Sequence, residues 1–235
     1  MRYKKYLAFW GLAVLLESAG LQGTRLAVDY GPVVPQGNFP APSTFFWPRL
    51  PAVSSEDGSL NLNVWSPKDA SPANRKAVMV WFHGGGFSTG SSVDLAAYDG
   101  RRLAEFGDVV VVSVNHRLNV LGHLDLSAYG PQYKDSANGG GVMDLVAALQ
   151  WVHDNIGRFG GNPSNVTIFG QSGGGAKVLT VMAAPAARGL FQKGIVQSGA
   201  VEGMGMTLFN PELGHRIAQY TFAGLGLRDG DVASL

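Results

Sequence analysis

A serine flanked by glycines stands where a β-rich run meets a helix-forming run. The segment reads "VTIFGQSGGGAKVL", Val166–Leu179, and Gly170–Gly174 fits the pattern G-x-S-x-G. Between a strand and a helix this pattern predicts a nucleophile elbow, a sharp turn that presents the Ser172 hydroxyl. Glycines suit such a turn because a Cβ would clash with the closely approaching backbone. A glycine-rich turn without chemistry fits the same residues, so this pattern alone leaves both interpretations open.

A phosphate-binding loop is a third interpretation of the same glycines. That loop requires G-x-x-x-x-G-K-[ST] after a strand. Gly170 and Gly175 have the required separation, but Ala176 precedes Lys177, and Val178 stands where a hydroxyl residue would bind magnesium. The lysine is one position late and the metal ligand is missing, so we expect no nucleotide binding.

A second glycine segment strengthens the case for acyl transfer. Phe82–Phe87 reads "FHGGGF" and follows an apolar run. Segments of this HGGG type expose backbone N–H groups that form an oxyanion hole. Acyl transfer needs both a nucleophile and donors placed where the carbonyl oxygen gains charge. Two such motifs, each after a buried strand and in this order, are far more specific than either one alone.

Alternating strands and helices are expected to position the two motifs. The apolar patterns predict strands over 60–65, 77–82, 109–114, 166–169 and 195–197, and helices over 98–106, 141–156, 175–183 and 211–222. The run 109–114 contains five Val and one Ser, as in a strand buried on both faces. Strands of this kind alternating with helices predict an α/β fold in one domain, with a parallel sheet covered on both sides.

Composition narrows the function classes further. The 235 residues are 46% hydrophobic and 15% charged, with a net charge of +1 and no cysteine. This balance indicates a globular chain and gives no sign of a nucleic-acid or membrane partner. The absence of cysteine excludes disulfides and thiolate metal sites. No His, Asp or Glu cluster has metal-ligand spacing, and we expect neither a metal nor another cofactor.

The N-terminus has the shape of a secretory signal over residues 1–20. Met1–Lys5 is basic, Tyr6–Leu16 is largely apolar, and Ser18–Gly20 offers small residues for cleavage. The apolar run is too short to cross a bilayer as a helix. A buried N-terminal segment of a cytoplasmic protein fits equally well, so the localisation stays open between a secreted and a cytoplasmic protein.

Five segments of the chain resemble the type B carboxylesterases, the cholinesterase-like branch of the α/β-hydrolases. They are "SEDGSLNLNVWSP" (Ser55–Pro67), "VWFHGGGF" (Val80–Phe87), "VVVVSVNHRLNVLGHL" (Val109–Leu124), "GVMDLVAALQWVHDNIGRFGGNPSNVTIFGQSGGG" (Gly141–Gly175) and "LFQKGIVQSGA" (Leu190–Ala200). The resemblance runs from about Ala27 to the C-terminus. It implies an α/β-hydrolase fold with a mostly parallel central sheet, helices on both faces and a small-molecule ester as substrate.

The resemblance also assigns roles to individual residues. It implies Ser172 as the nucleophile and the backbone N–H groups of Gly85, Gly86 and Gly173 as the oxyanion hole. It further implies a structural salt bridge between Arg117 and Asp144. The sequence alone explains Asp144 equally well as a charge interacting with the helix dipole. Gln171 departs from the Glu that usually precedes the nucleophile in the family.

No complete catalytic triad is visible in the sequence. In α/β-hydrolases the order along the chain is Ser, then Asp or Glu, then His. Only His215 follows Ser172, and it lies in a helical stretch one turn after Glu212, where a solvated helix face is the expected role. The other histidines come before Ser172: His83, His116, His123 and His153.

Family members are much longer than this chain. We therefore expect residues 21–235 to be the N-terminal half of an α/β-hydrolase domain, with its C-terminal part missing and the triad acid and His beyond Leu235. The missing half would then be a partner, and the sheet would continue past 195–197. The alternative is a catalytically inactive fragment or a cholinesterase-like interaction module.

Overall fold

The structure is a computed structural model that describes residues 8–13, 27, 29–37, 53–134, 136, 141–199 and 210–235. Most of the signal-like segment 1–20 lies outside these residues. Its described part is strand β1, Ala8–Ala13, which pairs antiparallel with the strand Asn61–Trp65.

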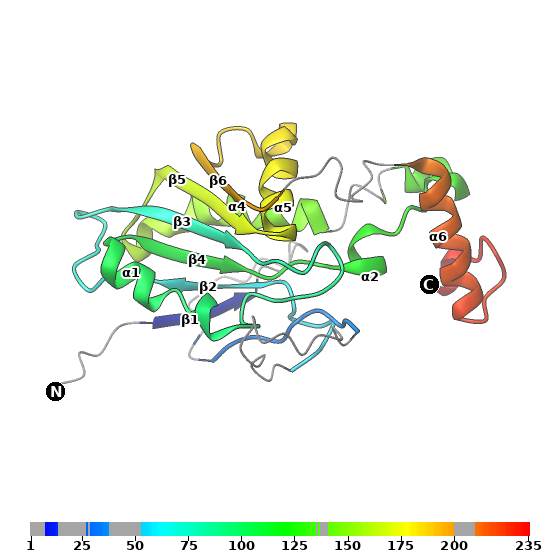
Figure 1. Cartoon of the computed structure of the whole chain (residues 1–235), viewed down its shortest axis with the longest axis horizontal. Helices are drawn as coiled ribbons and strands as arrows, with labels where there is room; N and C mark the ends of the chain where they lie inside the picture. Colours follow the sequence, from blue (N-terminus) through cyan, green and yellow to red (C-terminus); the bar gives the residue numbers. More distant parts are fainter. Residues whose placement is uncertain are drawn as a thin grey trace.

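The strands within the described residues form one sheet of six in the order β1-β2-β4-β3-β5-β6 (Figure 1). The other strands are β2 (Asn61–Trp65), β3 (Lys76–Phe82), β4 (Val110–Val114), β5 (Gly161–Gln171) and β6 (Lys193–Gln197). Strands β4, β3, β5 and β6 run parallel, while β2 pairs antiparallel with β4. The sheet is therefore mostly parallel, as predicted, and the carboxyl ends of β3 and β5 lie side by side.

Helices connect these strands. The α-helices are α1 (Arg101–Gly107), α2 (Asn119–His123), α4 (Gly141–Asn155), α5 (Gly173–Ala183) and α6 (Pro211–Gly224). Short 3₁₀ helices are η1 (Ala96–Tyr98), η2 (Ser127–Tyr129), η3 (Pro131–Tyr133), η4 (Ile156–Phe159), η5 (Pro185–Ala187) and η6 (Val232–Ser234).

Two predicted boundaries were wrong by more than about two residues, and the others differ by at most two residues. The helix expected over 98–106 begins at Arg101, because the Asp99 side chain accepts a hydrogen bond from the Arg101 N–H at 2.9 Å and ends the preceding turn. The strand expected over 166–169 extends over Gly161–Gln171. Pairing with β3, which reaches back to Lys76 opposite Gly161, holds this longer strand in place.

The apolar strands bury side chains on both faces of the sheet. Val110, Val112 and Val114 belong to the main core, together with the inner faces of α4 and α5. Val111 points to the other face, where it packs with Ala104 of α1. This alternation follows from the two-residue period of a strand. Helices therefore cover both faces of the sheet, as the sequence predicted.

The described part of the sheet ends in an exposed strand. β6 pairs with β5 on one side, and Ile195 and Val196 are 44% and 39% exposed.

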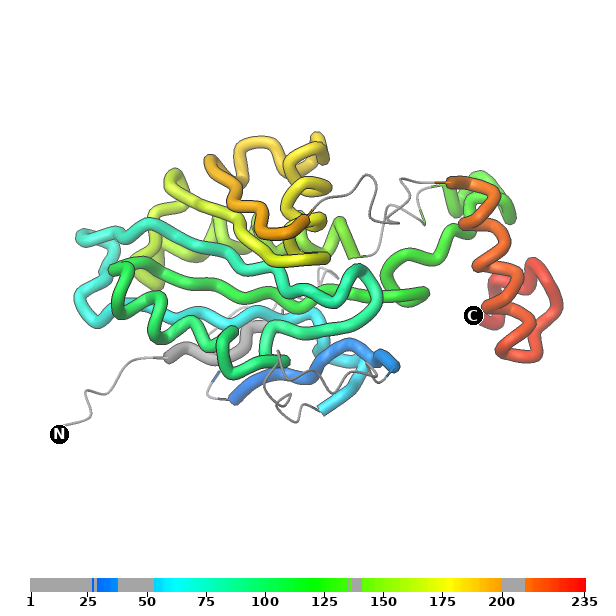
Figure 2. The backbone as a smooth tube through the Cα atoms, in the orientation of Figure 1, coloured from blue at the N-terminus to red at the C-terminus, as the bar shows by residue number. Residues whose placement is uncertain are grey.

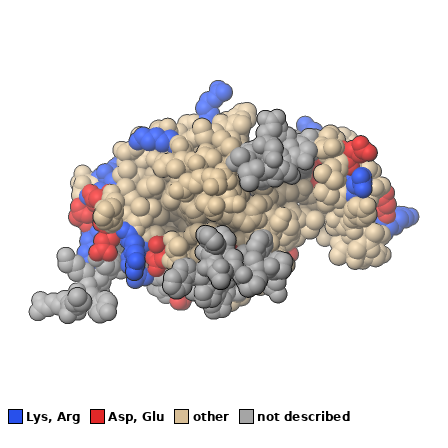
Figure 3. Space-filling view, viewed as in Figure 1, with Lys and Arg blue, Asp and Glu red and all other residues tan. Residues whose placement is uncertain are grey.

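Helix α6 lies well away from the sheet, beyond α2 (Figure 2). It packs against η2, where the Tyr129 and Phe222 rings lie 5.2 Å apart. Charged side chains of both signs gather at the two ends of the face in Figure 3, and its middle is largely uncharged.

Candidate active site

Ser172 lies on a sharp turn between β5 and α5. Its backbone has φ 56° and ψ −124°, a conformation that residues with a Cβ rarely adopt. The Ser172 N–H donates to the Gln197 carbonyl of β6 at 2.8 Å, and its carbonyl accepts from the Ala176 N–H at 3.1 Å. These two bonds fix the turn to the neighbouring strand and to the first turn of α5. The Ser172 residue itself is exposed.

The glycines after Ser172 allow α5 to start directly against β3. A Cβ on Gly173 would collide with the backbone of Gly86, and a Cβ on Gly174 would collide with the Phe82 carbonyl. Both obstacles are backbone atoms, which cannot turn aside as a side chain can. Glycine at these positions is therefore what brings the serine turn and the glycine segment Gly84–Gly86 into contact.

The segment Gly84–Gly86 follows β3 at the same edge of the sheet. Gly85 and Gly86 have φ of +89° and +65°, in the left-handed region that favours glycine. A Cβ on Gly84 would lie 3.7 Å from the Ser172 Cβ. The Gly85 carbonyl accepts from the Thr89 N–H at 3.1 Å, which closes the loop. Gly85 and Gly86 thus occupy the same corner as Ser172.

The far end of this loop is held by the N-terminal coil. Gln36 donates through Nε2 to the Gly90 carbonyl at 2.9 Å and accepts from the Gly90 N–H at 2.6 Å. This pair of bonds satisfies both backbone groups of Gly90 from a residue distant in sequence. The loop carrying the glycines is therefore fixed at Gly85 and again at Gly90.

The corner is suited to stabilising an oxyanion. Backbone N–H groups at the start of α5 have no partner within the helix, and the helix dipole adds positive potential there. The glycine segment brings further backbone N–H groups to within van der Waals reach of the same turn. Such donors stabilise the negative charge that develops on a carbonyl oxygen attacked by a nucleophile.

Arg117 and Asp144 form an ion pair between the end of β4 and the start of α4. The Arg117 Nη2 lies 2.7 Å from the Asp144 Oδ1, and the Arg117 Nε and backbone N lie 2.9 and 2.8 Å from Oδ2. The Asp144 side chain is only 2% exposed. The hydrogen bond to Asp144 raises the pKa of Arg117 above its usual range. This pair joins the segment after β4 to the first turn of α4.

The described histidines do not supply a base to Ser172. His83 is buried, its Nδ1 lies 2.8 Å from the Gly84 carbonyl, and its ring stacks on His116 at 4.9 Å. Burial, with a smaller contribution from the Lys177 charge, lowers the pKa of His116 well below its usual range and that of His123 to about 4. Within the described residues, no histidine forms a hydrogen bond with the Ser172 hydroxyl.

His215 lies on α6, away from the α5 turn (Figure 1). Its ring packs against Tyr129 at 5.3 Å, and the residue is half-buried. The sequence predicted a solvated helix face there, and His215 is less exposed than that prediction implied.

Where the residues are described, no group of His, Cys, Asp and Glu could hold a metal ion. None of the described helices is long and apolar enough to cross a membrane.

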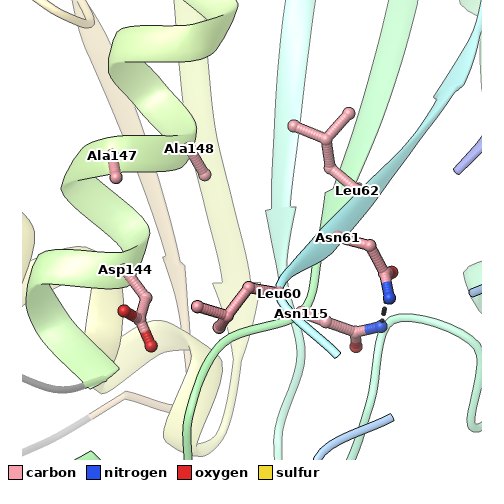
Figure 4. Close-up of a pocket in the computed structure, with 7 residues that line it drawn as sticks. All are labelled: Leu60, Asn61, Leu62, Asn115, Asp144, Ala147 and Ala148. Carbon is pink, nitrogen blue, oxygen red and sulfur yellow. Dashed lines mark hydrogen bonds between the residues drawn. The ribbon is translucent and has the colours of Figure 1, made fainter. Parts of the chain in front are cut away.

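One small pocket lies apart from the serine turn, between α4 and the start of β2 (Figure 4). Its volume of about 10 Å³ is close to what one water needs. Beside it the Asn115 side chain donates to Asn61 at 2.9 Å. The pocket is lined by Leu60, Asn61, Leu62, Asn115, Asp144, Ala147 and Ala148. It is too small for a substrate.

Sequence reasoning overlooked Lys177. It entered only as a misplaced phosphate-loop lysine, whereas its side chain is fully buried at 0% exposure. Its Nζ donates to the His83 carbonyl at 2.9 Å. The available signal was a single lysine in the otherwise apolar run 176–179, on the face that a helix after a buried strand must bury.

The chain is similar to known esterases. A model of the carboxylesterase family matches residues 17–220. The chain is 44% identical over 177 residues to the para-nitrobenzyl esterase of Bacillus subtilis, covering 74% of this chain and 34% of that protein. It is 46% identical over 148 residues to acetylcholinesterase 4 of Caenorhabditis briggsae, and this match covers 63% of this chain and 23% of that protein. The chain therefore spans about a third or less of the length of these relatives.

Solved esterase structures share the fold. A Clostridium hathewayi esterase described as hydrolysing aliphatic aromatic polyesters aligns with a TM-score of 0.79 and 45% identity. That alignment covers 88% of this chain and 41% of the other. A Geobacillus stearothermophilus carboxylesterase aligns with a TM-score of 0.73 and 40% identity, over 89% and 40% of the two chains. The described architecture is thus an α/β-hydrolase fold.

Proposed function

Because this chain belongs to the carboxylesterase family, we propose that it carries the nucleophile and the oxyanion hole of a serine carboxylesterase. The substrate class is small carboxylic esters. One observation carries the proposal: the strained Ser172 turn and the segment Gly84–Gly86 meet at one corner, with the backbone of Gly173 against that of Gly86. A nucleophile and oxyanion donors are the two parts that acyl transfer requires in one place.

The reaction begins when the Ser172 oxygen attacks the ester carbonyl carbon. The hydroxyl proton passes to a general base, and the N–H groups of Gly85, Gly86 and Gly173 hold the resulting oxyanion. Collapse of this intermediate breaks the bond to the alcohol oxygen, which takes the proton from the base, and leaves an acyl group on Ser172. Water then attacks the acyl carbon and gives its proton to the base. The bond between that carbon and the Ser172 oxygen breaks, this oxygen takes the proton from the base, and the carboxylic acid leaves.

The base and its orienting acid are proposed to follow Leu235. A serine hydroxyl is a weak nucleophile without a base at hydrogen-bond distance. The described residues offer Ser172 no such histidine, and the acid and His follow the nucleophile in this fold. We expect the 235 residues alone to hydrolyse esters far more slowly than the complete gene product. This is the inactive-fragment alternative, and ester hydrolysis at catalytic rates by the 235 residues would exclude it.

The nucleophile is tested by labelling the complete gene product with a fluorophosphonate, which reacts with activated serines. Ser172→Ala should abolish labelling and ester hydrolysis. Ser198→Ala is the matched control, since Ser198 is also exposed, has φ 51°, and follows the neighbouring strand β6. Ser198→Ala should label like the wild type. Labelling that survives Ser172→Ala would refute the proposal.

A further inference from the structure

The buried Lys177 side chain reaches both ends of the glycine segment. Its Nζ donates to the carbonyl of His83, the residue before Gly84, at 2.9 Å. The same Nζ lies 5.7 Å from the ring centroid of Phe87, the residue after Gly86, within cation–π distance. One group on the helix that follows the nucleophile therefore contacts the residues on either side of the proposed oxyanion donors.

Among the described residues, none gives Lys177 a counter-charge. The titratable groups that face it are His83 after β3, His116 after β4 and His123 of α2, and His123 in turn interacts with the Arg117–Asp144 ion pair. Within the described residues, no carboxylate pairs with Lys177. Burial lowers the pKa of Lys177 to about 7.

A buried, unpaired lysine is costly, because desolvation disfavours the charged amine. An apolar residue would fill the same space in α5 at lower cost. The hydrogen bond to the His83 carbonyl and the contact with Phe87 are the interactions that the lysine adds. Both act on the glycine segment, whose residues have no side chains of their own to hold them.

We propose that Lys177 is a positioning residue, which ties α5 to both ends of Gly84–Gly86 and so sets the direction of the oxyanion-hole N–H groups. This inference rests on the proposed function. Lys177 itself does not touch the reacting atoms. It acts by keeping the nucleophile turn and the donors in one fixed relation, a relation on which oxyanion stabilisation depends steeply.

The test compares Lys177→Met with Lys193→Met in the complete gene product. Methionine is unbranched and similar in volume, but it is one atom shorter and lacks the donor. Lys193 is an exposed lysine of β6 that bonds to Asn165. Lys177→Met should lower kcat for a short p-nitrophenyl ester by about tenfold or more, with KM changed by less than about threefold. Backbone amides of residues 84–87 should exchange with deuterium faster. Lys193→Met should change neither.

The outcomes separate this inference from the proposed function. If Ser172→Ala is inactive and Lys177→Met keeps wild-type kcat and exchange, the positioning role is refuted while the nucleophile stands. If Ser172→Ala stays active, the proposed function fails, and the exchange data still decide whether Lys177 holds the segment. If Lys177→Met does not fold, the wild-type protein provides the test. The NMR signals of the backbone amides of residues 84–86 should shift over the same pH range in which the Lys177 amine titrates. Amide signals that do not follow the titration of Lys177 would refute the role.

Discussion

The ion pair between Arg117 and Asp144 allows a quantitative test of the fold behind the candidate site. Replacing Arg117 by Ala removes the Nε and Nη2 donors, which lie 2.9 and 2.7 Å from the Asp144 oxygens. The carboxylate keeps the bond from the backbone N of residue 117, at 2.8 Å. Because the Asp144 side chain is 2% exposed, water can replace the lost donors only in part.

Leaving a buried charge unpaired costs about 3–5 kcal/mol. We expect the lower end for Arg117→Ala, about 3 kcal/mol, since the Arg117 side chain is 39% exposed and its removal opens a path for solvent. In a protein of this size each kcal/mol lowers Tm by about 2–4 °C, so the expected decrease is about 6–12 °C. Arg117→Lys should lose less, because it keeps the charge but loses the paired geometry.

Urea unfolding and a thermal melt followed by circular dichroism measure these changes. Arg101→Ala serves as the control, since it breaks an exposed pair with Asp99 at 3.3 Å and should cost less than about 1 kcal/mol. If Arg117→Ala destabilised the protein no more than Arg101→Ala does, the argument from burial of Asp144 would be wrong.

Two further predictions concern the glycine contact and acid stability. Gly173→Ala should lower ester hydrolysis more than about 100-fold, because its Cβ would meet the backbone of Gly86 and displace an oxyanion donor. The Cβ added by Gly86→Ala would meet nothing closer than the Ser88 N at 4.0 Å, so this substitution should mainly lower stability, by about 1–2 kcal/mol, because of the positive φ. A loss of activity in Gly86→Ala equal to that in Gly173→Ala would contradict this reasoning. Burial lowers the pKa of His123 from 6.5 to about 4, so the folded state resists the proton that the unfolded state binds. The free energy of unfolding should therefore decrease by about 3 kcal/mol as the pH falls from 6.5 to 4, which urea unfolding measures. His123→Asn should make this decrease smaller, whereas the exposed control His153→Asn should leave it unchanged.

The sequence predicted the architecture well, because its strands and helices have strong patterns. The valine run 109–114 and the apolar stripe of 141–156 depend on local periodicity, which reads directly as β4 and α4. The boundaries at Arg101 and Gly161 were missed because they depend on a hydrogen bond from the Arg101 N–H to the Asp99 side chain and on pairing with a distant strand. The pairing with β3 is not a local property of the residues in β5.

The candidate site was predictable only in part. Glycine spacing indicated the Ser172 turn and the segment Gly84–Gly86, because both turns need residues without a Cβ. The roles of Lys177 and Gln36 were not visible, since each acts on a backbone group more than fifty residues away along the chain. Contacts of this kind depend on where the fold brings two segments together, and composition or spacing does not encode them.

The backbone of Ser172 sets a limit on how stable this protein can become. Holding a residue with a Cβ at φ 56° and ψ −124° costs about 1–3 kcal/mol. A glycine there would relax the turn and delete the hydroxyl in the same step. Selection of variants for thermodynamic stability alone would therefore favour a protein that is more stable and has lost its nucleophile.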